Sequence, residues 1–592
     1  MKIPINLNSL WCSSFAKHIS QFGVRDVCIS PGSRSTPLTL AFSLNKKFRV
    51  YPIVDERSSG FFALGLAKKS NSPVVIVTTS GTAVAELYPA IIEAFYQRIP
   101  LIVCTADRPP YLRNRGANQT INQDNIYKNH IRFFADPGLP ENKRDKFNAL
   151  RKVTYQAVST SLYKNRGPVH INFPFDKPFE PDTFTHSIDK KIIQKLNTLN
   201  IPKSANQLDI STAKQINKLA TLIKRKRKGI IVCGYNNFEK DFVKNLINFS
   251  NRAGYPIFAD GSSGLRYGKH SKENIIENFN SLIRSELFAK HFDPEVIIHF
   301  GGSATSNQMH DFMKGSSAEK ILINQFGDIN DPSLTANKVI KINHQDFCIT
   351  VLSRLNNFHF DQNEWEDQIR NLNNLVNKTK SFFLTITKLN SEPGIIHNLI
   401  KVLPSNCNLM VSNSLPIRDI DFFSNCSGKE IKLFTNRGAS GIDGINSTAL
   451  GIAKNSKNPT VLLTGDLAFY HDLTGLHNSQ KFSIPLTIVL INNEGGGIFE
   501  SLPISGFGKI YKDNFVVPLK LDFSKIVKAF DGNYYIENES ESFNVTLQKA
   551  LKSKKLNVIE IKTSAKLSKQ NRTKFWNTAI KEVDNYINAN IC

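Results

Sequence analysis

Two short β-prone runs, each ending in polar residues, constrain the fold of this chain more than any other feature. The run at 460–464 stops at the Gly-Asp pair 465–466, and the run at 485–491 stops at the Asn-Asn pair 492–493. The stretch 472–478 and its flanking residues are long enough for a crossover helix, so the two runs are predicted to be neighbouring parallel strands. Their carboxyl ends would then meet at the edge where open α/β sheets bind ligands.

Asp466 and Asn493 would bring a carboxylate and an amide oxygen to one point of this edge. Asn493 lies 27 positions after Asp466, and the backbone carbonyls of 493–495 would lie nearby. Hard oxygen ligands of this kind suit Mg²⁺, which usually also takes phosphate oxygens from a substrate or cofactor. The alternative is a pair of ordinary turns, since Gly-Asp and Asn-Asn are common turn formers.

Strand and turn signals recur along the rest of the chain. Each apolar run of the first region is followed by a polar turn bearing Gly, Ser or Pro and then by a helical pattern, which predicts a doubly wound parallel sheet. The middle region has strand signals of its own but no GxGxxG fingerprint, so a bound dinucleotide is not expected. We therefore predict an α/β protein with three doubly wound, Rossmann-like domains and mostly parallel sheets. The runs lie at 27–30, 49–54, 74–78, 101–105, 229–234, 296–302 and 320–324.

Glu56 stands out in the first region. It follows an apolar run and precedes the apolar helical stretch 60–66. This position predicts a partly buried carboxylate with a raised pKa, able to keep a proton available. The alternative is a solvent-exposed glutamate at the end of a strand.

Length and cysteine usage limit the class of protein. A chain of 592 residues implies about three or four domains. Its eight cysteines are scattered with no CxxC pair, which suits a reduced, cytoplasmic protein better than a disulfide scaffold or a zinc site. No apolar run approaches the ~20 residues of a membrane helix, and the N-terminus has no signal-peptide pattern, so membrane insertion is not expected.

The formal net charge of +25 raises the possibility of nucleic-acid binding, because basic surfaces attract phosphate backbones. The basic residues are mostly dispersed, however, and the one dense run, 224–228, directly precedes an apolar strand. The chain contains no helix-turn-helix, zinc-finger or RNA-recognition signature. A solvated basic surface is therefore the preferred interpretation, and no nucleic-acid partner is expected.

The Gly-Asp to Asn-Asn spacing resembles the signature of thiamine-diphosphate enzymes. Further segments in both end regions resemble one family of these enzymes, the 2-succinyl-5-enolpyruvyl-6-hydroxy-3-cyclohexene-1-carboxylate synthases. The resemblance implies a pyrimidine-binding domain at 1–181, a central transhydrogenase-like domain at 200–362 and a diphosphate-binding domain at 385–592. The stretches 182–210 and 360–385 are candidate linkers. The matching segments are 30–38, 54–67, 79–94, 105–123, 413–421, 436–444 and the stretch 465–499.

The resemblance also implies a cofactor and its ligands. Thiamine diphosphate would bind with Mg²⁺ or Mn²⁺, which would be held by Asp466, Asn493 and the carbonyl of Gly495. Glu56 would hydrogen-bond the aminopyrimidine ring and promote formation of the thiazolium carbanion. Ile442 would hold the cofactor in a bent conformation. The other implied cofactor contacts are Ser80, Gly81, Gly465 and Leu467, the last of which stands where the family often has glycine.

For the reaction, the resemblance implies decarboxylation of 2-oxoglutarate and 1,4-addition of the succinyl carbanion equivalent to isochorismate, in menaquinone biosynthesis. Both substrates are anions, and the planar fork of arginine pairs well with carboxylates. Ile498 and Phe499 would line an apolar wall near the reacting carbon. The remaining implied substrate contacts are Ser33, Arg34, Arg108, Gln119, Ser414, Arg418 and Arg437.

One position departs from the family pattern. Asn307 stands where family members often carry a lysine that assists carboxylate binding. Either substrate affinity is lower, or another basic residue such as Lys314 substitutes.

The resemblance also implies an assembly. Family members take the metal and the glutamate from different protomers, so a homodimer or tetramer with a shared site is expected.

Two other functions stay open at this point. One is a different thiamine-diphosphate carboligase or decarboxylase that acts on another 2-oxoacid, including the acetohydroxyacid-synthase type with a flavin in the middle domain. The other is a cofactor-binding or regulatory protein that has lost turnover. Intact Glu56, Asp466 and Asn493 weigh against the second of these.

Overall fold

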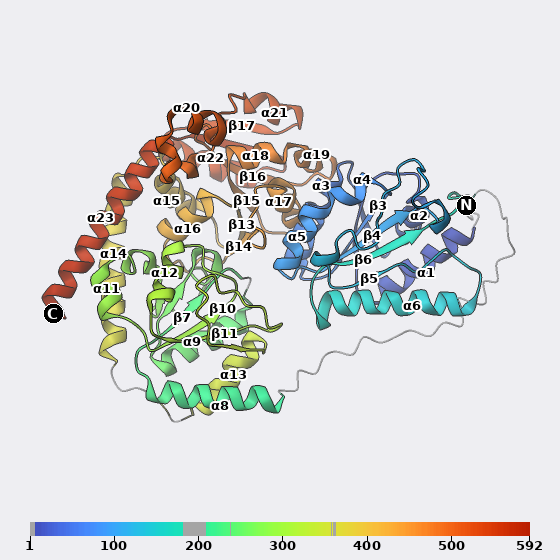
Figure 1. Ribbon diagram of the computed structural model, residues 1–592. Coiled ribbons are helices and arrows are strands. Elements are labelled where there is room, and N and C mark those ends of the chain that lie inside the picture. Colours follow the sequence, from blue (N-terminus) through green and yellow to red (C-terminus); the bar gives the residue numbers. More distant parts are fainter. Residues whose placement is uncertain (1–5, 182–208, 237, 357, 359–362, 592) are drawn as a thin grey trace.

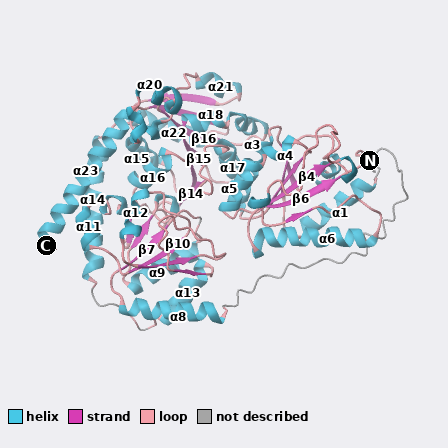
Figure 2. Ribbon diagram, in the orientation of Figure 1, coloured by secondary structure: helices cyan, strands magenta, loops and turns pink. Residues whose placement is uncertain are grey.

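Three six-stranded parallel sheets organise the chain. The computed structural model describes residues 6–181, 209–236, 238–356, 358 and 363–591. Every strand pairing within the three sheets is parallel. Figure 1 shows the sheets in three separate lobes, and Figure 2 shows helices packed around their strands. The predicted α/β fold with three doubly wound parallel sheets is confirmed.

The first sheet has the strand order β2-β1-β3-β4-β6-β5. It contains the four strands predicted in the first region and two that the sequence patterns did not indicate, β5 and β6. The strands are β1 (Asp26–Ile29), β2 (Arg49–Pro52), β3 (Val74–Thr78), β4 (Leu101–Asp107), β5 (Phe134–Ala135) and β6 (Val169–Pro174). The helices are α1 (Leu7–Gln21), α2 (Thr36–Ser43), α3 (Glu56–Ser70), α4 (Thr82–Glu86), α5 (Tyr88–Tyr96) and α6 (Arg144–Ser159).

The second sheet has the order β12-β11-β10-β7-β8-β9. Its three predicted strands are β7 (Gly229–Cys233), β10 (Val296–Phe300) and β11 (Glu319–Ile323), and it adds β8 (Ile257–Ala259), β9 (Ile275–Ile276) and β12 (Lys338–Ile340). The helices of this lobe are α8 (Ile210–Arg225), α9 (Lys240–Ala253), α10 (Phe279–Leu282), α11 (Glu286–His291), α12 (Asn307–Gly315) and α13 (His344–Arg354).

The third sheet has the order β14-β13-β15-β16-β18-β17. Its strands are β13 (Cys407–Val411), β14 (Ile431–Thr435), β15 (Thr460–Gly465), β16 (Leu486–Asn492), β17 (Asn533–Glu537) and β18 (Leu556–Lys562). The helices are α14 (Glu364–Ile386), α15 (Glu392–Val402), α16 (Leu415–Phe423), α17 (Ile445–Lys454), α18 (Asp466–His471), α19 (His477–Lys481), α20 (Gly508–Tyr511), α21 (Phe523–Ala529), α22 (Ser540–Lys552) and α23 (Ala565–Asn590).

The two strands that the sequence predicted as neighbours, β15 and β16, do pair in parallel. The prediction of a single crossover helix between them is wrong. The connection is built from α18, a 3₁₀ turn (Leu473–Leu476) and α19. Buried Asp472 ends α18 and accepts hydrogen bonds from the Ser447 backbone N–H at 2.6 Å and hydroxyl at 2.9 Å, which fixes the break between the two helices.

The limits of the three predicted domains stay a prediction. Each sheet falls inside one of the ranges 1–181, 200–362 and 385–592. The candidate linker 182–210 lies almost wholly outside the described residues. Most of the second candidate linker, 360–385, belongs to α14, which runs beside α23 along one side of the molecule (Figure 1).

The first and third lobes meet through a close crossing of α3 and α17, which lie side by side at their junction (Figure 1). A Cβ added to Gly65 would lie 2.1 Å from the Thr448 carbonyl oxygen, and one added to Gly451 would lie 2.2 Å from the Phe62 carbonyl oxygen. Buried apolar residues of both lobes, from Phe62 to Leu462, form one continuous cluster around this crossing. The two lobes therefore share a core.

A buried ion pair joins the second lobe to the third. Arg266 donates to Asp421 at 2.8 Å, and both side chains are fully buried. The Gly261 backbone N–H donates to the same carboxylate at 2.6 Å.

Among the described residues, no helix is long and apolar enough to span a bilayer.

We expect Gly65→Ala to lower the midpoint of thermal unfolding, because the new methyl group would clash with the backbone of α17. Overpacking of this kind costs on the order of 1–3 kcal/mol. Gly315→Ala is the matched control, since a Cβ there meets nothing within 4 Å. Equal midpoints for the two variants would contradict the tight helix crossing.

Candidate active site

The strand-end residues Asp466 and Gly495 meet at the carboxyl edge of the third sheet. Asp466 begins α18 directly after β15, and its side chain accepts hydrogen bonds from the Gly495 N–H at 2.7 Å and the Leu467 N–H at 2.8 Å. Burial raises the pKa of Asp466 to about 6, and these two donors act in the opposite direction. The carboxylate is thus held against the loop that follows β16, as the motif spacing predicted.

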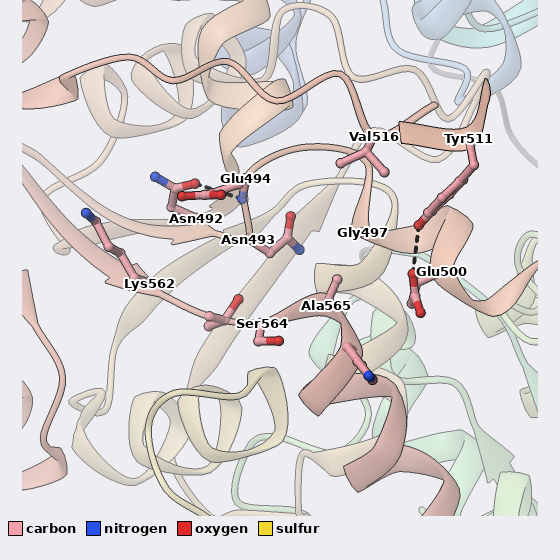
Figure 3. Close-up of a pocket in the computed structure, with 12 residues that line it drawn as sticks. Asn492, Asn493, Glu494, Gly497, Glu500, Tyr511, Val516, Lys562, Ser564 and Ala565 are labelled. Carbon is pink, nitrogen blue, oxygen red and sulfur yellow. Dashed lines mark hydrogen bonds between the residues drawn. The ribbon is translucent and has the colours of Figure 1, made fainter. Parts of the chain in front are cut away.

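Asn493 presents an unsatisfied oxygen in the same place. Its Oδ1 is buried and has no hydrogen-bond partner in the described part of the chain, whereas its Nδ2 donates to Glu392 at 3.3 Å. Asn493 lines a pocket of about 480 Å³ between the loop after β16 and the start of α23 (Figure 3). A buried acceptor without a donor is costly for a protein, and a bound cation is one way to satisfy it.

Glu392 connects this amide to the C-terminal helix. Its Oε2 lies 3.5 Å from Arg572 of α23, and Arg572 makes a two-pronged ion pair with Asp419 of α16 at 2.7 and 2.6 Å. Glu392 and Asp419 are fully buried. Burial raises the pKa of Glu392, and the Arg572 guanidinium acts in the opposite direction.

Glycines are required where the segment before Val517 folds back over the loop that follows β16. Gly495 has a φ of +127°, and a Cβ there would lie 1.9 Å from the Val516 carbonyl oxygen. The Gly496 N–H donates to that same carbonyl at 2.7 Å. The carboxylate of Asp466, the Oδ1 of Asn493 and the Gly495 carbonyl, which accepts the Gly497 N–H at 2.8 Å, are hard oxygens of the kind that Mg²⁺ prefers.

Glu56 is the first residue of α3 and is half-buried. Burial raises its pKa, with Asp55 and Glu86 adding repulsion, which confirms the expectation from sequence. In the described part of the chain its carboxylate has no hydrogen-bond partner beyond its own backbone. The neighbouring Arg57 donates to the His471 carbonyl at 3.1 Å, so the start of α3 contacts the far end of α18 from Asp466.

Ser80, Gly81, Arg108 and Gln119 come together at the carboxyl end of β3. Arg108 donates to the Ser80 hydroxyl at 2.7 Å, that hydroxyl donates to the Gln119 carbonyl at 3.1 Å, and the Gln119 amide donates back to the Ser80 carbonyl at 3.0 Å. Gly81 has a φ of +84°, and a Cβ there would lie 2.9 Å from the Gln119 side chain. These predicted residues therefore form one cluster.

Arg34 adds a second cation near this cluster. Its Nη1 donates to the Phe175 carbonyl at 2.7 Å, while its Nε is buried without a partner in the described structure. Burial and the nearby Arg108 lower the pKa of Arg34 to about 10. Two guanidinium groups with spare donors at one sheet edge are suited to a carboxylate ligand.

A second arginine pair lies at the edge of the third sheet. Ser414 precedes α16 with a φ of +72°, and Arg418 donates to its carbonyl at 2.6 Å. The pKa of Arg418 is lowered by burial and by the charge of Arg437. The Nε of Arg437 is buried and unpartnered among the described residues, and its Nη1 lies 3.4 Å from Asn413.

The other predicted residues are more dispersed. Ser33 is exposed, whereas Gly465, Leu467, Ile442, Ile498 and Phe499 are partly buried. Phe499 packs edge-on against Phe515 at 5.5 Å between ring centroids. Asn307 and Lys314 lie exposed at opposite ends of α12, and neither side chain makes a hydrogen bond or ion pair within the described ranges. No hydrogen bond or ion pair of the described structure joins Glu56 to Asp466, Asn493 or Ile442.

Some residues of the site were not predicted. Gln123 accepts from the Gly81 N–H at 3.1 Å, and Asn413 donates to the carbonyls of Asn436 at 2.6 Å and Gly441 at 2.7 Å. Gln123 and Asn413 lie inside the matching segments, so the motifs contained a signal for them. Glu392 lies outside every such segment.

Three family models of thiamine pyrophosphate enzymes match this chain. The N-terminal binding domain of thiamine pyrophosphate enzymes matches residues 13–126, the middle domain of such enzymes matches 195–411, and their C-terminal binding domain matches 432–561. The first and last of these contain Glu56 and Asp466.

Curated relatives match over nearly the whole chain. A 2-succinyl-5-enolpyruvyl-6-hydroxy-3-cyclohexene-1-carboxylate synthase from Bacillus cytotoxicus is 36% identical over 586 residues, 98% of each chain. Synthases of the same name from Geobacillus kaustophilus and Haloquadratum walsbyi are 34% and 33% identical, covering 97% and 98% of this chain and 98% and 99% of their own.

A solved structure shares the fold at low sequence identity. The benzoylformate decarboxylase from Polynucleobacter necessarius superposes with a TM-score of 0.68 at 16% identity, over 94% of this chain and 98% of its own. This match concerns the arrangement of the three lobes alone.

Proposed function

Because the chain belongs to the 2-succinyl-5-enolpyruvyl-6-hydroxy-3-cyclohexene-1-carboxylate synthase family of thiamine-diphosphate enzymes, we propose that it decarboxylates 2-oxoglutarate and adds the succinyl unit to isochorismate. The addition is 1,4. The reaction gives CO₂ and 2-succinyl-5-enolpyruvyl-6-hydroxy-3-cyclohexene-1-carboxylate and belongs to menaquinone biosynthesis. The observation that carries this function is the full-length similarity to synthases of that name. A different thiamine-diphosphate 2-oxoacid carboligase or decarboxylase is not favoured, since the decarboxylase similarity is limited to the fold.

The metal belongs to the same proposal. Asp466, the Oδ1 of Asn493 and the carbonyl of Gly495 would hold Mg²⁺ or Mn²⁺, and the diphosphate would complete its coordination. The unpartnered, buried Oδ1 of Asn493 supports this assignment. The further cofactor contacts we propose are Ser80, Gly81, Ile442, Gly465 and Leu467.

When bound, thiamine diphosphate supplies the nucleophilic carbon at which 2-oxoglutarate loses CO₂ and from which the succinyl unit adds to isochorismate. Glu56 would hold a proton against the aminopyrimidine ring, and burial, which raises its pKa, favours the protonated form. Ile498 and Phe499 would form an apolar wall that keeps water from protonating the reacting carbon before the acceptor arrives. The packing of Phe499 on Phe515 supports this placement.

Recognition of the two anionic substrates is assigned to arginines. Arg34 with Arg108, and Arg418 with Arg437, each place two guanidinium groups at a sheet edge. Both pairs carry a buried Nε without a partner in the described structure, which supports a role in binding an external carboxylate. Ser33, Gln119 and Ser414 are proposed to add neutral hydrogen bonds.

We further propose that the active site is shared between two copies of the chain, as a homodimer or tetramer. One chain supplies Glu56 and the other supplies the metal ligands. Val54 beside Glu56 is 68% exposed and Tyr470 on α18 is 46% exposed, so apolar surface next to both half-sites is available for a partner to cover. A cytoplasmic location is part of the proposal, and the seven described cysteines are all free thiols.

The reaction is tested by following isochorismate absorbance in the purified protein with thiamine diphosphate, Mg²⁺ and 2-oxoglutarate. Glu56→Gln is expected to lower kcat by orders of magnitude, because glutamine cannot hold the required proton. Thiamine diphosphate should still bind this variant, as measured by fluorescence quenching. Glu541→Gln, which alters an exposed carboxylate on α22 of the third lobe, should keep its activity. Full activity in Glu56→Gln would exclude Glu56 as the activating group.

The metal assignment predicts a change in Mg²⁺ dependence. Asn493→Ala removes one proposed ligand and should raise the Mg²⁺ concentration for half-maximal cofactor binding by about tenfold or more. Asn514→Ala, which changes an exposed asparagine in the segment above the same loop, is the control. An unchanged Mg²⁺ requirement in Asn493→Ala would count against this ligand set.

The shared site predicts complementation between two inactive variants. Mixed dimers of Glu56→Gln and Asp466→Asn chains contain one site with both defects and one intact site. After subunit exchange, random pairing should restore about a quarter of wild-type activity. If two differently tagged variants co-purify as mixed dimers and the mixture stays inactive, the two residues belong to one chain's site instead.

A further inference from the structure

The loop that carries Arg437 belongs to the third lobe but is held by two helices of the first. On one side, Lys68 of α3 donates to the Thr435 carbonyl at 2.5 Å and to the Asn436 side-chain oxygen at 2.7 Å. Gln97, which follows α5, donates to the same Thr435 carbonyl at 3.2 Å. The chain is therefore fixed immediately before Arg437.

Glu93 of α5 holds the other side of the loop. Its Oε1 accepts from the Gly438 N–H at 2.9 Å, and its Oε2 accepts from the Ala439 N–H at 2.7 Å. A Cβ at Gly438 would lie 2.6 Å from the Glu93 carbonyl oxygen, so the loop approaches α5 at backbone distance. Both flanks of Arg437 are thereby tied to the first lobe.

Burying the charges of Lys68 and Glu93 costs free energy, so fold stability alone does not account for this pair. Their side chains are only 1% and 3% exposed, and their closest charged atoms lie 4.0 Å apart. A buried ion pair of this kind often stabilises a fold no better than apolar residues of similar volume. Here both carboxylate oxygens of Glu93, and two donors of Lys68, are used by the loop.

Arg437 itself has few side-chain contacts to hold it. Its Nε is buried without a partner in the described structure, and its hydrogen bond to Asn413 is long, at 3.4 Å. The position of its guanidinium therefore depends on the backbone of 435–439, which the first lobe controls.

We propose that Lys68 and Glu93 are positioning residues that aim the Arg437 guanidinium at a substrate carboxylate. The proposal rests on the proposed function, since that carboxylate belongs to 2-oxoglutarate or isochorismate. It makes the first lobe of a chain a determinant of substrate affinity in the third lobe of the same chain, separately from the role of Glu56.

Steady-state kinetics of both substrates test the proposal. Arg437→Lys first identifies which substrate's KM depends on Arg437. Glu93→Gln should raise the KM of that same substrate by about tenfold or more, because it removes charge-assisted hydrogen bonds to the loop. The KM of the other substrate and the Kd of thiamine diphosphate should change less than about twofold. Combining Glu93→Gln with Arg437→Lys should raise the KM little further, since both act on one contact.

Two more variants keep the test decisive. Lys68→Met with Glu93→Gln leaves no unpaired buried charge and should fold even where Glu93→Gln alone does not. Gln97→Leu removes an uncharged donor to the loop and should raise the same KM by a smaller factor. Glu430→Gln, in an exposed ion pair with Lys240, is the control and should change none of these constants.

Equal increases in both KM values and in the Kd of the cofactor, or additive effects of Glu93→Gln and Arg437→Lys, would overturn the positioning role. These results would assign Lys68 and Glu93 to fold stability alone. Failure of the wild-type protein to consume isochorismate would instead count against the proposed function. That outcome is seen before any variant is measured.

Discussion

The close crossing of α3 and α17 is the contact on which the site depends. Gly65 and Gly451 let the two helices approach at backbone distance, and Gly444, with a φ of +64°, leaves room for the Phe61 ring at the start of α17. With the helices fixed in this way, α3 presents Glu56 at one end and Lys68 near the other. The loop before α17, which carries Arg437 and Ile442, lies against the same helix.

Some buried polar groups of the site have hydrogen-bond or ionic partners within the chain, and others do not. The buried carboxylates of Asp421, Asp419 and Glu93 all have cationic or backbone partners within the chain. Other buried polar atoms have no partner in the described structure, and three of them belong to residues with a proposed external ligand: the Asn493 oxygen and the Nε atoms of Arg34 and Arg437. The oxygen suits a cation, and the two Nε–H groups suit carboxylates.

The sequence predicted the parts of this arrangement that depend on local pattern. Strand ends and Gly-rich turns located β15, β16 and the Asp466–Gly495 contact, and the apolar helix after Glu56 predicted its partial burial. Contacts between residues far apart in sequence were missed, because no local period encodes them. Glu392 against Asn493, and Lys68 with Glu93 against the Arg437 loop, are examples. The split crossover was also missed, since its cause is the buried Asp472, whose partner Ser447 lies on another helix.

The ion pair of Arg572 with Glu392 and Asp419 has a consequence for biosynthesis. Both carboxylates are translated well before their cation, which lies on α23. On a growing chain, the third lobe would have to bury two acidic groups without compensation, which is unfavourable. We therefore expect α23 to dock late in folding, when Arg572 compensates the charge of Glu392, which holds the Asn493 amide. The proposed metal ligand Asn493 would therefore gain its full support only after that helix has been made.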